Sequence, residues 1–181
     1  MSEKYKFHSE DELYFTTSTV ISWVDLFTRL PFQNIIIDSL KFCQTEFGLV
    51  IHAWCIMSNH VHLIVSSQGE PLSDIFRKFK THTSKAIRNE LLEGTDGRRT
   101  WILPIFRKAA DRLNRNKEYK VWIDGNHPVM LDNNFMLDQR LNYVHQNPVK
   151  AGLVTSPEDY ALSSARDYAG EKGLIDVVLI E

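Results

Sequence analysis

Apolar residues recur along the chain with two different periods, and the period changes from one segment to the next. Between Glu12 and Trp23 the chain is rich in β-branched and aromatic residues, which predicts a first strand. From Pro31 onward, apolar residues follow at roughly helical spacing, and Gly48 closes the run. The chain is therefore expected to begin with a strand that is followed by a helix.

The next part of the chain predicts a hairpin and then a long helix. Two strand-like runs, residues 49–57 and 60–67, flank a turn at Ser58-Asn59. A helix is then predicted from about Leu72 to Leu92, with an apolar side that faces inward. The residues on that side are Ile75, Phe79, Ile87 and Leu91.

The later elements complete an alternation of strands and helices. A second basic helix is expected to open at Pro104 and to run to about Asn114, and residues 120–125 predict another strand. A further helix is expected from about Asn133 to Asn147, capped by Asp132 and stopped by the following proline. This order predicts an α+β protein with an antiparallel sheet and helices packed on one face.

Length and composition favour one soluble domain. At 181 residues, with no internal repeat or linker, the chain is expected to form a single domain over residues 1–181, with a peripheral tail from about residue 155. The N-terminus lacks the apolar core of a signal peptide, and no run approaches the roughly 18 apolar residues of a membrane span. Cys43 and Cys55 do not resemble a disulfide framework. We therefore expect a cytoplasmic protein that does not enter a membrane.

The net charge of −2 conceals an uneven distribution of charge. Between Phe76 and Lys120 there are 13 Lys and Arg against 5 Asp and Glu, a local balance of +8, whereas the remainder carries −10. Such asymmetry permits one phosphate-binding face on a protein of low overall pI. A merely solvated helical surface would show the same charges, and the sequence leaves both readings open.

Two histidines in an apolar strand are the first candidates for chemistry. His60 and His62 lie two residues apart, so their side chains project from the same face of the strand, while Val61, Leu63 and Val65 take the opposite face. Paired imidazoles on one sheet face can bind one divalent ion. The alternative is a polar sheet face with no ligand.

The second candidate is the segment LNYVHQNPVKAGL near the end of the last predicted helix. Tyr143 and Asn147 are four residues apart and share one helix face. The side-chain carbonyl of Asn147, at the helix end, could reach a metal ion. On the plainer alternative, Tyr143 is a tyrosine at the rim of the core and Asn147 is a cap.

Together the two motifs closely resemble the single-tyrosine transposases of the His-hydrophobic-His (HUH) endonucleases. The resemblance rests on His60-Val61-His62 and on Tyr143 within YVHQNPVKAGLV, in this order, and it runs from the first strand to about Gly170. Within that superfamily, the chain is most similar to the IS200-like transposases of small insertion sequences and to their REP-associated relatives.

The resemblance implies a fold, an activity and a set of residue roles. The fold would be ferredoxin-like or RRM-like, with both histidines on a central strand. The enzyme would cleave and rejoin single-stranded or hairpin DNA through a 5′-phosphotyrosine, with Tyr143 as nucleophile, and we expect a homodimer. His60, His62 and Asn147 would hold Mg²⁺ or Mn²⁺. Five cations of the long helix would bind the DNA backbone: Arg77, Lys78, Lys80, Lys85 and Arg88.

Two other classes of protein compete with this interpretation. A catalytically silent or domesticated DNA-binding protein could keep the fold, although His60, His62, Tyr143 and Asn147 all occur together here. An RNA-binding module of the same fold would need paired exposed aromatic residues on its central strands. The chain offers histidines at those positions instead.

Overall fold

The sheet has four antiparallel strands in the order β2-β3-β1-β4. The computed structural model describes residue 7 and residues 12–111 and 118–180. The strands are β1 (Tyr14–Thr19), β2 (Leu49–Ile56), β3 (His60–Ser67) and β4 (Val129–Met130). With one helix between β1 and β2 and others between β3 and β4, the order is that of a ferredoxin-like sheet, and β1 and β3 are its central strands.

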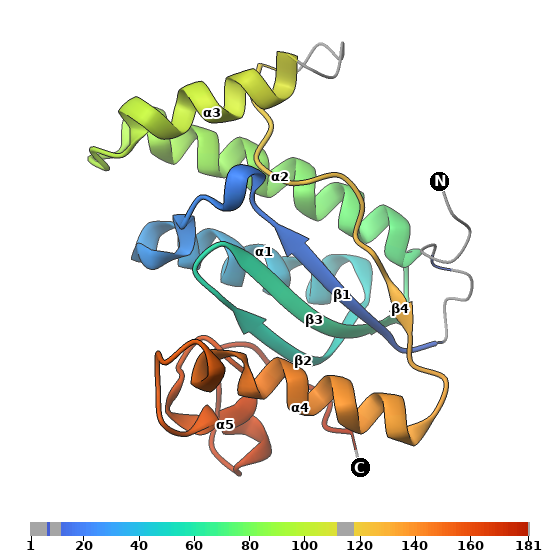
Figure 1. Ribbon diagram of the computed structural model, residues 1–181. Coiled ribbons are helices and arrows are strands. Elements are labelled where there is room, and N and C mark those ends of the chain that lie inside the picture. The colour runs from blue at the N-terminus through green and yellow to red at the C-terminus, as the bar shows by residue number, and fades with distance from the viewer. Residues whose placement is uncertain (1–6, 8–11, 112–117, 181) are drawn as a thin grey trace.

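Five α-helices and three short 3₁₀ turns connect and cover these strands in the described residues (Figure 1). The helices are α1 (Leu30–Phe47), α2 (Leu72–Glu93), α3 (Arg99–Asp111), α4 (Asn134–Lys150) and α5 (Ala165–Tyr168). The 3₁₀ turns are η2 (Ile21–Trp23), η3 (Leu26–Thr28) and η4 (Pro157–Asp159). Figure 1 shows α3 alongside α2, and α4 on the side of the sheet away from α1.

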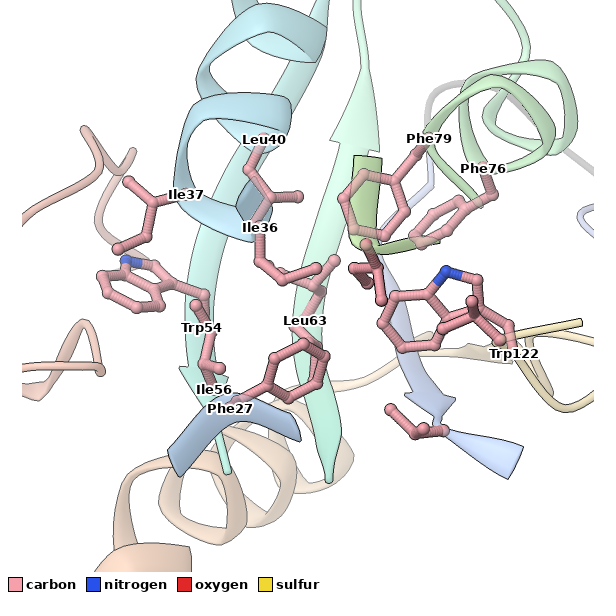
Figure 2. Packing of buried hydrophobic residues seen from close by; sticks show 14 of the residues in the cluster. Phe27, Ile36, Ile37, Leu40, Trp54, Ile56, Leu63, Phe76, Phe79 and Trp122 are labelled. Atoms are coloured by element: carbon pink, nitrogen blue, oxygen red, sulfur yellow. The ribbon is translucent and has the colours of Figure 1, made fainter. Parts of the chain in front are cut away.

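One face of the sheet packs against α1 and α2 and forms the larger core. Because side chains alternate along a strand, Val61, Leu63 and Val65 of β3 all enter this core. Figure 2 shows Leu63 beneath Ile36 and Leu40 of α1, and the same cluster extends to aromatic side chains of α2. These contacts bury the apolar side of each helix that the sequence pattern predicted.

The other face of the sheet is covered by α4. Ile64 of β3, Cys55 of β2 and Phe15 of β1 form a second, smaller core together with Val144 of α4. The α+β class and the antiparallel sheet are confirmed, and α1 and α2 do share one face. The structure adds a helix on the opposite face, where α4 covers Ile64 of β3 together with Cys55 and Phe15, so the middle of β3 is buried on both sides.

The hairpin and the first two helices end where their sequence signals lie. Gly48 follows α1 in the left-handed conformation with φ of 73°, and a Cβ there would come within 2.7 Å of the Gly69 backbone nitrogen. Glycine is the one residue that accepts both conditions without strain. The turn at Ser58-Asn59 joins β2 to β3 as expected.

Two expected boundaries are wrong. Pro104 does not open the second basic helix but lies inside α3, which begins at Arg99; the expected end at Asn114 falls outside the described residues. Residues 120–125 are not a strand, although Trp122 forms an isolated bridge with Val20. This segment follows the edge of β1 until the positive φ of Gly125 and His127 turns the chain, so regular pairing starts only at β4.

The last long helix also differs from its prediction at both ends. Its cap is Asn133, whose side chain accepts a hydrogen bond from the Met136 backbone nitrogen, and not Asp132. The helix passes through Pro148 and ends at Lys150. Pro148 has no N–H to donate to the preceding turn, yet α4 continues for two more residues. Its end is closed by Gly152, with φ of 70°, and by a hydrogen bond from the Leu153 nitrogen to the Pro148 carbonyl.

The chain after α4 returns to the free edge of β2. The Ile56 nitrogen donates to the Leu162 carbonyl, the Ser164 nitrogen donates to Trp54, and the Val178 nitrogen donates to Ile51. Residues beyond about 155, expected as a peripheral tail, thus occupy the hydrogen-bonding groups of an edge strand. In the part of the chain that the structure describes, no helix combines the length and apolarity needed to cross a membrane.

Replacing Leu63 tests the importance of the larger core. This side chain is 1% exposed on a central strand, so Leu63→Ala should lower the free energy of unfolding by about 2–5 kcal/mol in urea titrations. Leu30→Ala is the matched control, because Leu30 is 65% exposed and its loss should change stability by less than about 0.5 kcal/mol. Equal effects of the two substitutions would contradict this description of the core.

Candidate active site

The two histidines of β3 lie side by side on the face that α4 covers. Their ring centroids are 4.6 Å apart, as expected for residues two apart on one strand. His62 is buried, with 3% of its surface exposed, whereas His60 is partly exposed near the start of the strand. The pair therefore extends from the interior of the protein to its surface.

Each imidazole is held through its Nδ1 atom. Thr17 Oγ1, directly opposite on β1, lies 2.8 Å from Nδ1 of His62, and Asn59 Oδ1 lies 2.7 Å from Nδ1 of His60. Because the Asn59 oxygen can only accept, His60 Nδ1 is the donor in that bond, which leaves Nε2 of the neutral ring with a free lone pair. These two hydrogen bonds orient the rings, so that each Nε2 atom points away from the hydrogen-bonded side of its own ring.

The Nε2 atom of His62 is buried and has no hydrogen-bond partner among the described residues. A buried polar group without a partner costs about 1–3 kcal/mol, so such atoms usually have a functional explanation. Burial lowers the pKa of His62 to about 3, with smaller contributions from the nearby charges of His60 and Arg140. Burial also lowers the pKa of His60. Both rings are consequently poor proton acceptors, and in their neutral form they offer lone pairs to an electrophile.

Tyr143 meets this pair from α4. Its ring is 5.2 Å from that of His62, edge to face, and 5.8 Å from the ring of Phe15. Val144, the next residue, is fully buried in the smaller core and fixes the rotation of the helix over the sheet. The structure therefore brings together three of the four residues selected from the two separate motifs.

Asn147 lies one helical turn beyond Tyr143. Its side-chain nitrogen donates to the Tyr143 carbonyl over 2.9 Å, so the amide folds back along α4. Within the described residues its Oδ1 accepts no hydrogen bond, and its side chain has no hydrogen bond to either histidine. No group of three His, Cys, Asp or Glu side chains suited to a metal ion occurs in that part of the chain.

Four of the five cations selected on α2 line one groove. The groove has a volume of about 460 Å³ and lies between α2 and residues 118–126. Lys85 is exposed there, and Lys80 donates to the Gly125 carbonyl over 2.6 Å. Burial lowers the pKa of Lys80 to about 8. The floor of the groove, residues 121–126, runs along the edge of β1, the strand next to the histidines.

The remaining cations of this set are partly neutralised by acidic neighbours. Arg77 pairs with Asp74 at 3.1 Å, and Arg88 pairs with Glu118 at 2.8 Å. Lys78 is the one residue of the five that does not line the groove, because it lies over the Phe47 ring and binds Glu70. The positive charge that faces the groove is therefore smaller than the sequence count suggests.

Sequence reasoning missed two side chains that the structure adds to the site. Thr17 is polar in a strand and pairs with His62 across the sheet, but this register depends on tertiary structure. Arg140 is three residues before Tyr143, a spacing that places it on the same helix face, and its guanidinium carbon lies 6.0 Å from the Tyr143 ring centroid. The helical period could have identified Arg140.

In the structure, the paired histidines of β3 and the tyrosine of α4, which come from two separate motifs, lie together on one face of a ferredoxin-like sheet. Residues 25–102 match the family model described as Transposase IS200 like, which confirms the family resemblance. The matched range includes both histidines, and Tyr143 lies beyond it. A comparison with curated protein sequences finds no match.

Comparison with solved structures supports the fold over the whole chain. A structure described as a REP-associated tyrosine transposase bound to a REP hairpin superposes with a TM-score of 0.61 and 18% sequence identity. The alignment covers 100% of this chain and 96% of that one. At this level of identity the likeness establishes the shared fold, including the ferredoxin-like sheet.

Proposed function

We propose that this chain is an IS200-like transposase that cleaves and rejoins DNA strands with Tyr143 as its covalent nucleophile. The observation that carries the proposal is the position of the Tyr143 ring, 5.2 Å from a buried histidine whose Nε2 atom has no partner among the described residues. A tyrosine that only completed the core would not need to face such an atom. The match of residues 25–102 to a transposase family supports DNA strand cleavage as the general activity.

The donor set fits a divalent cation of the Mg²⁺ or Mn²⁺ type. The Nε2 atom of His60 has a lone pair directed away from its hydrogen bond to Asn59, and Nε2 of His62 has the same lone pair when its Nδ1 donates to Thr17. The Asn147 nitrogen binds the helix backbone, and within the described residues its Oδ1 accepts no hydrogen bond. We propose these three residues as the protein ligands. Mixed nitrogen and oxygen donors with open positions suit such ions. When bound, the ion would polarise the scissile phosphate and stabilise charge on the leaving oxygen.

The covalent step follows from the chemistry of a phenol. The Tyr143 oxygen forms a bond to phosphorus, and the bond from phosphorus to the 3′ oxygen breaks with its electron pair passing to that oxygen. The phenol proton is lost to solvent, and the 3′ oxygen takes up a proton from solvent. The resulting 5′-phosphotyrosine conserves the ester bond, so a second 3′-hydroxyl can reverse the step and join a strand.

The nucleic acid in this proposal is single-stranded or hairpin DNA. The solved relative is described as bound to a REP hairpin, and the basic groove of this chain lies beside the strand next to its histidines. We propose that Arg77, Lys80, Lys85 and Arg88 contact the DNA backbone there. Lys78 lies outside the groove and is bound to Glu70, so we expect it to contribute less to binding of the DNA backbone.

A homodimer remains part of the proposal, and the structure limits how it could form. The edge of β2 is hydrogen-bonded to residues 162–164 and 178, so two sheets could not join through β2 unless these bonds were broken. An RNA-binding module is less well supported, because α4 covers the sheet face on which bases would stack.

Replacing the nucleophile gives the direct test. Tyr143→Phe should abolish the covalent adduct with labelled hairpin DNA on denaturing gels, while melting temperature and DNA affinity stay close to those of the parent. Tyr168→Phe is a matched control that should keep the adduct, because Tyr168 bonds to the His52 carbonyl away from the site. No adduct with any hairpin from the parent would instead favour a catalytically silent DNA-binding protein.

The metal ligands can be tested without DNA. His60→Ala and His62→Ala should each weaken Mn²⁺ binding in calorimetry by at least about tenfold, because loss of a ligand should cost at least as much as loss of an orienting partner. Metal-dependent nicking should fall with it. His82→Ala, an exposed histidine on α2, should leave both unchanged. If either His60→Ala or His62→Ala bound Mn²⁺ as tightly as the parent, the assignment of that histidine as a metal ligand would be refuted.

The groove is tested by the salt dependence of binding. The double variant Arg77→Gln/Lys85→Gln should weaken the binding of hairpin DNA, and the log–log salt slope should fall by about 0.7–0.9 for each lost phosphate contact. Lys41→Gln/Lys172→Gln removes the same charge from exposed positions outside the groove and should leave the slope unchanged. Fluorescence anisotropy over a salt series measures both. Identical slopes would show that the groove does not bind phosphate.

A further inference from the structure

Two cations flank the ring of the proposed nucleophile. The guanidinium carbon of Arg140 lies 5.0 Å from the ring centroid of Phe15 and 6.0 Å from that of Tyr143. The Lys150 nitrogen lies 5.9 Å from the Tyr143 centroid. Because these residues stand three before and seven after Tyr143 on α4, they occupy the same helix face, one and two turns away.

Neither cation has an acidic partner among residues 12–111 and 118–180. Of the fourteen other described Lys and Arg residues, seven are ion-paired, Arg88 and Arg98 among them. Arg140 forms no hydrogen bond or ion pair in that part of the chain, and its Nε atom is buried without an acceptor. A buried guanidinium N–H without a partner is costly, which points to an acceptor supplied from outside the protein.

The surroundings of this donor favour an anion. Arg140, one turn before Tyr143, and Lys150, two turns after it, supply positive charge 6.0 and 5.9 Å from the centroid of the Tyr143 ring. The His62 ring lies 5.2 Å from the same ring. Phe15 lies against Arg140, His62 and Tyr143 and fills the space between them, so the guanidinium is held on a packed support. An arginine held in this way presents a planar set of donors that matches two oxygens of one phosphate.

We propose that Arg140 and Lys150 form a phosphodiester-binding site that holds the scissile phosphate against the Tyr143 oxygen. This inference rests on the proposed function of Tyr143, and it adds a catalytic contact that the histidines and Asn147 do not provide. Arg140 binds the two non-bridging oxygens and stabilises the charge that accumulates on them as the phenol attacks. Lys150, which is exposed, adds a second, more mobile positive charge at the mouth of the site.

Binding is tested with the dinucleotide TpT, which contains a single phosphodiester, and with its uncharged methylphosphonate analogue. In NMR titrations of the full chain, TpT should produce a saturable shift of the Arg140 Nε–H resonance. The analogue should bind at least about tenfold more weakly, because it has the same shape and bases but no charge. Equal shifts from the two compounds, or no shift from TpT, would overturn the proposal.

Matched variants separate the charge from the packing. Arg140→Met keeps an unbranched apolar stem over Phe15 but removes the donors, and it should abolish the discrimination between the two dinucleotides. Arg140→Lys should retain part of this discrimination, because the positive charge remains although the two parallel N–H donors of the guanidinium are lost. Lys41→Met, which changes an exposed residue of α1 outside the groove, should behave like the parent. Thermal melts of each variant establish that it is folded, and full discrimination in folded Arg140→Met would refute the site.

The rate of adduct formation connects this site to the reaction. On a hairpin that the parent cleaves, Arg140→Met should slow formation of the Tyr143 adduct by about 10²–10³-fold, as for loss of a donor to a developing oxyanion. An unchanged rate would overturn the role of Arg140 while leaving Tyr143 as nucleophile. If the proposed function of Tyr143 were wrong instead, the result would differ: TpT would still shift the Arg140 Nε–H resonance, yet the parent protein would form no covalent adduct.

Discussion

The packing of α4 across the open face of the sheet is the interaction on which the candidate site depends. Val144 is fully buried against the smaller core that Ile64 and Cys55 help to form, and this contact determines which side of α4 faces β3. With Val144 directed into the sheet, Tyr143 comes to lie over His62, and Arg140, one turn earlier, comes to lie over Phe15. A rotation of the helix by one residue, about 100°, would separate all of them.

The two faces of the sheet have different tasks. The face toward α1 and α2 is a continuous apolar core that includes Trp54, Leu63 and Trp122, and it holds the larger of the two clusters of buried residues (Figure 2). The face toward α4 has fewer apolar residues and contains His62, a buried group with an unused nitrogen. The larger core can offset the cost of that atom, which allows the second face to keep the groups that a metal and a phosphate would need.

Charge is distributed in a way that the net value conceals. On α2, Arg77 and Arg88 are ion-paired, and Lys80 binds backbone carbonyls. Arg140 and Lys150, in a part of the chain with a negative overall balance, have no such partners among the described residues. The number of cations in a segment therefore overstates the positive charge that is left to meet an anion.

Local signals in the sequence determined the α+β class, the hairpin, α1, α2 and the projection of His60 and His62 from one strand face. These follow from side-chain periodicity, from Gly48 and from Ser58-Asn59, all of which act over a few residues. The two motifs also pointed to the family whose model matches residues 25–102. Only the tertiary structure decided that residues 120–125 run beside β1 without forming a strand, and that α4 covers the face opposite α1.

The same division applies to the site. Residue types and spacing selected His60, His62, Tyr143 and Asn147, but they did not indicate Thr17, which reaches His62 only because β1 pairs with β3 in one particular register. Nor could they show that the His62 Nε2 and Arg140 Nε atoms lack partners in the described chain, because hydrogen-bond satisfaction depends on every element packed around an atom. Local sequence determined the candidate groups, and long-range packing decided which of them meet.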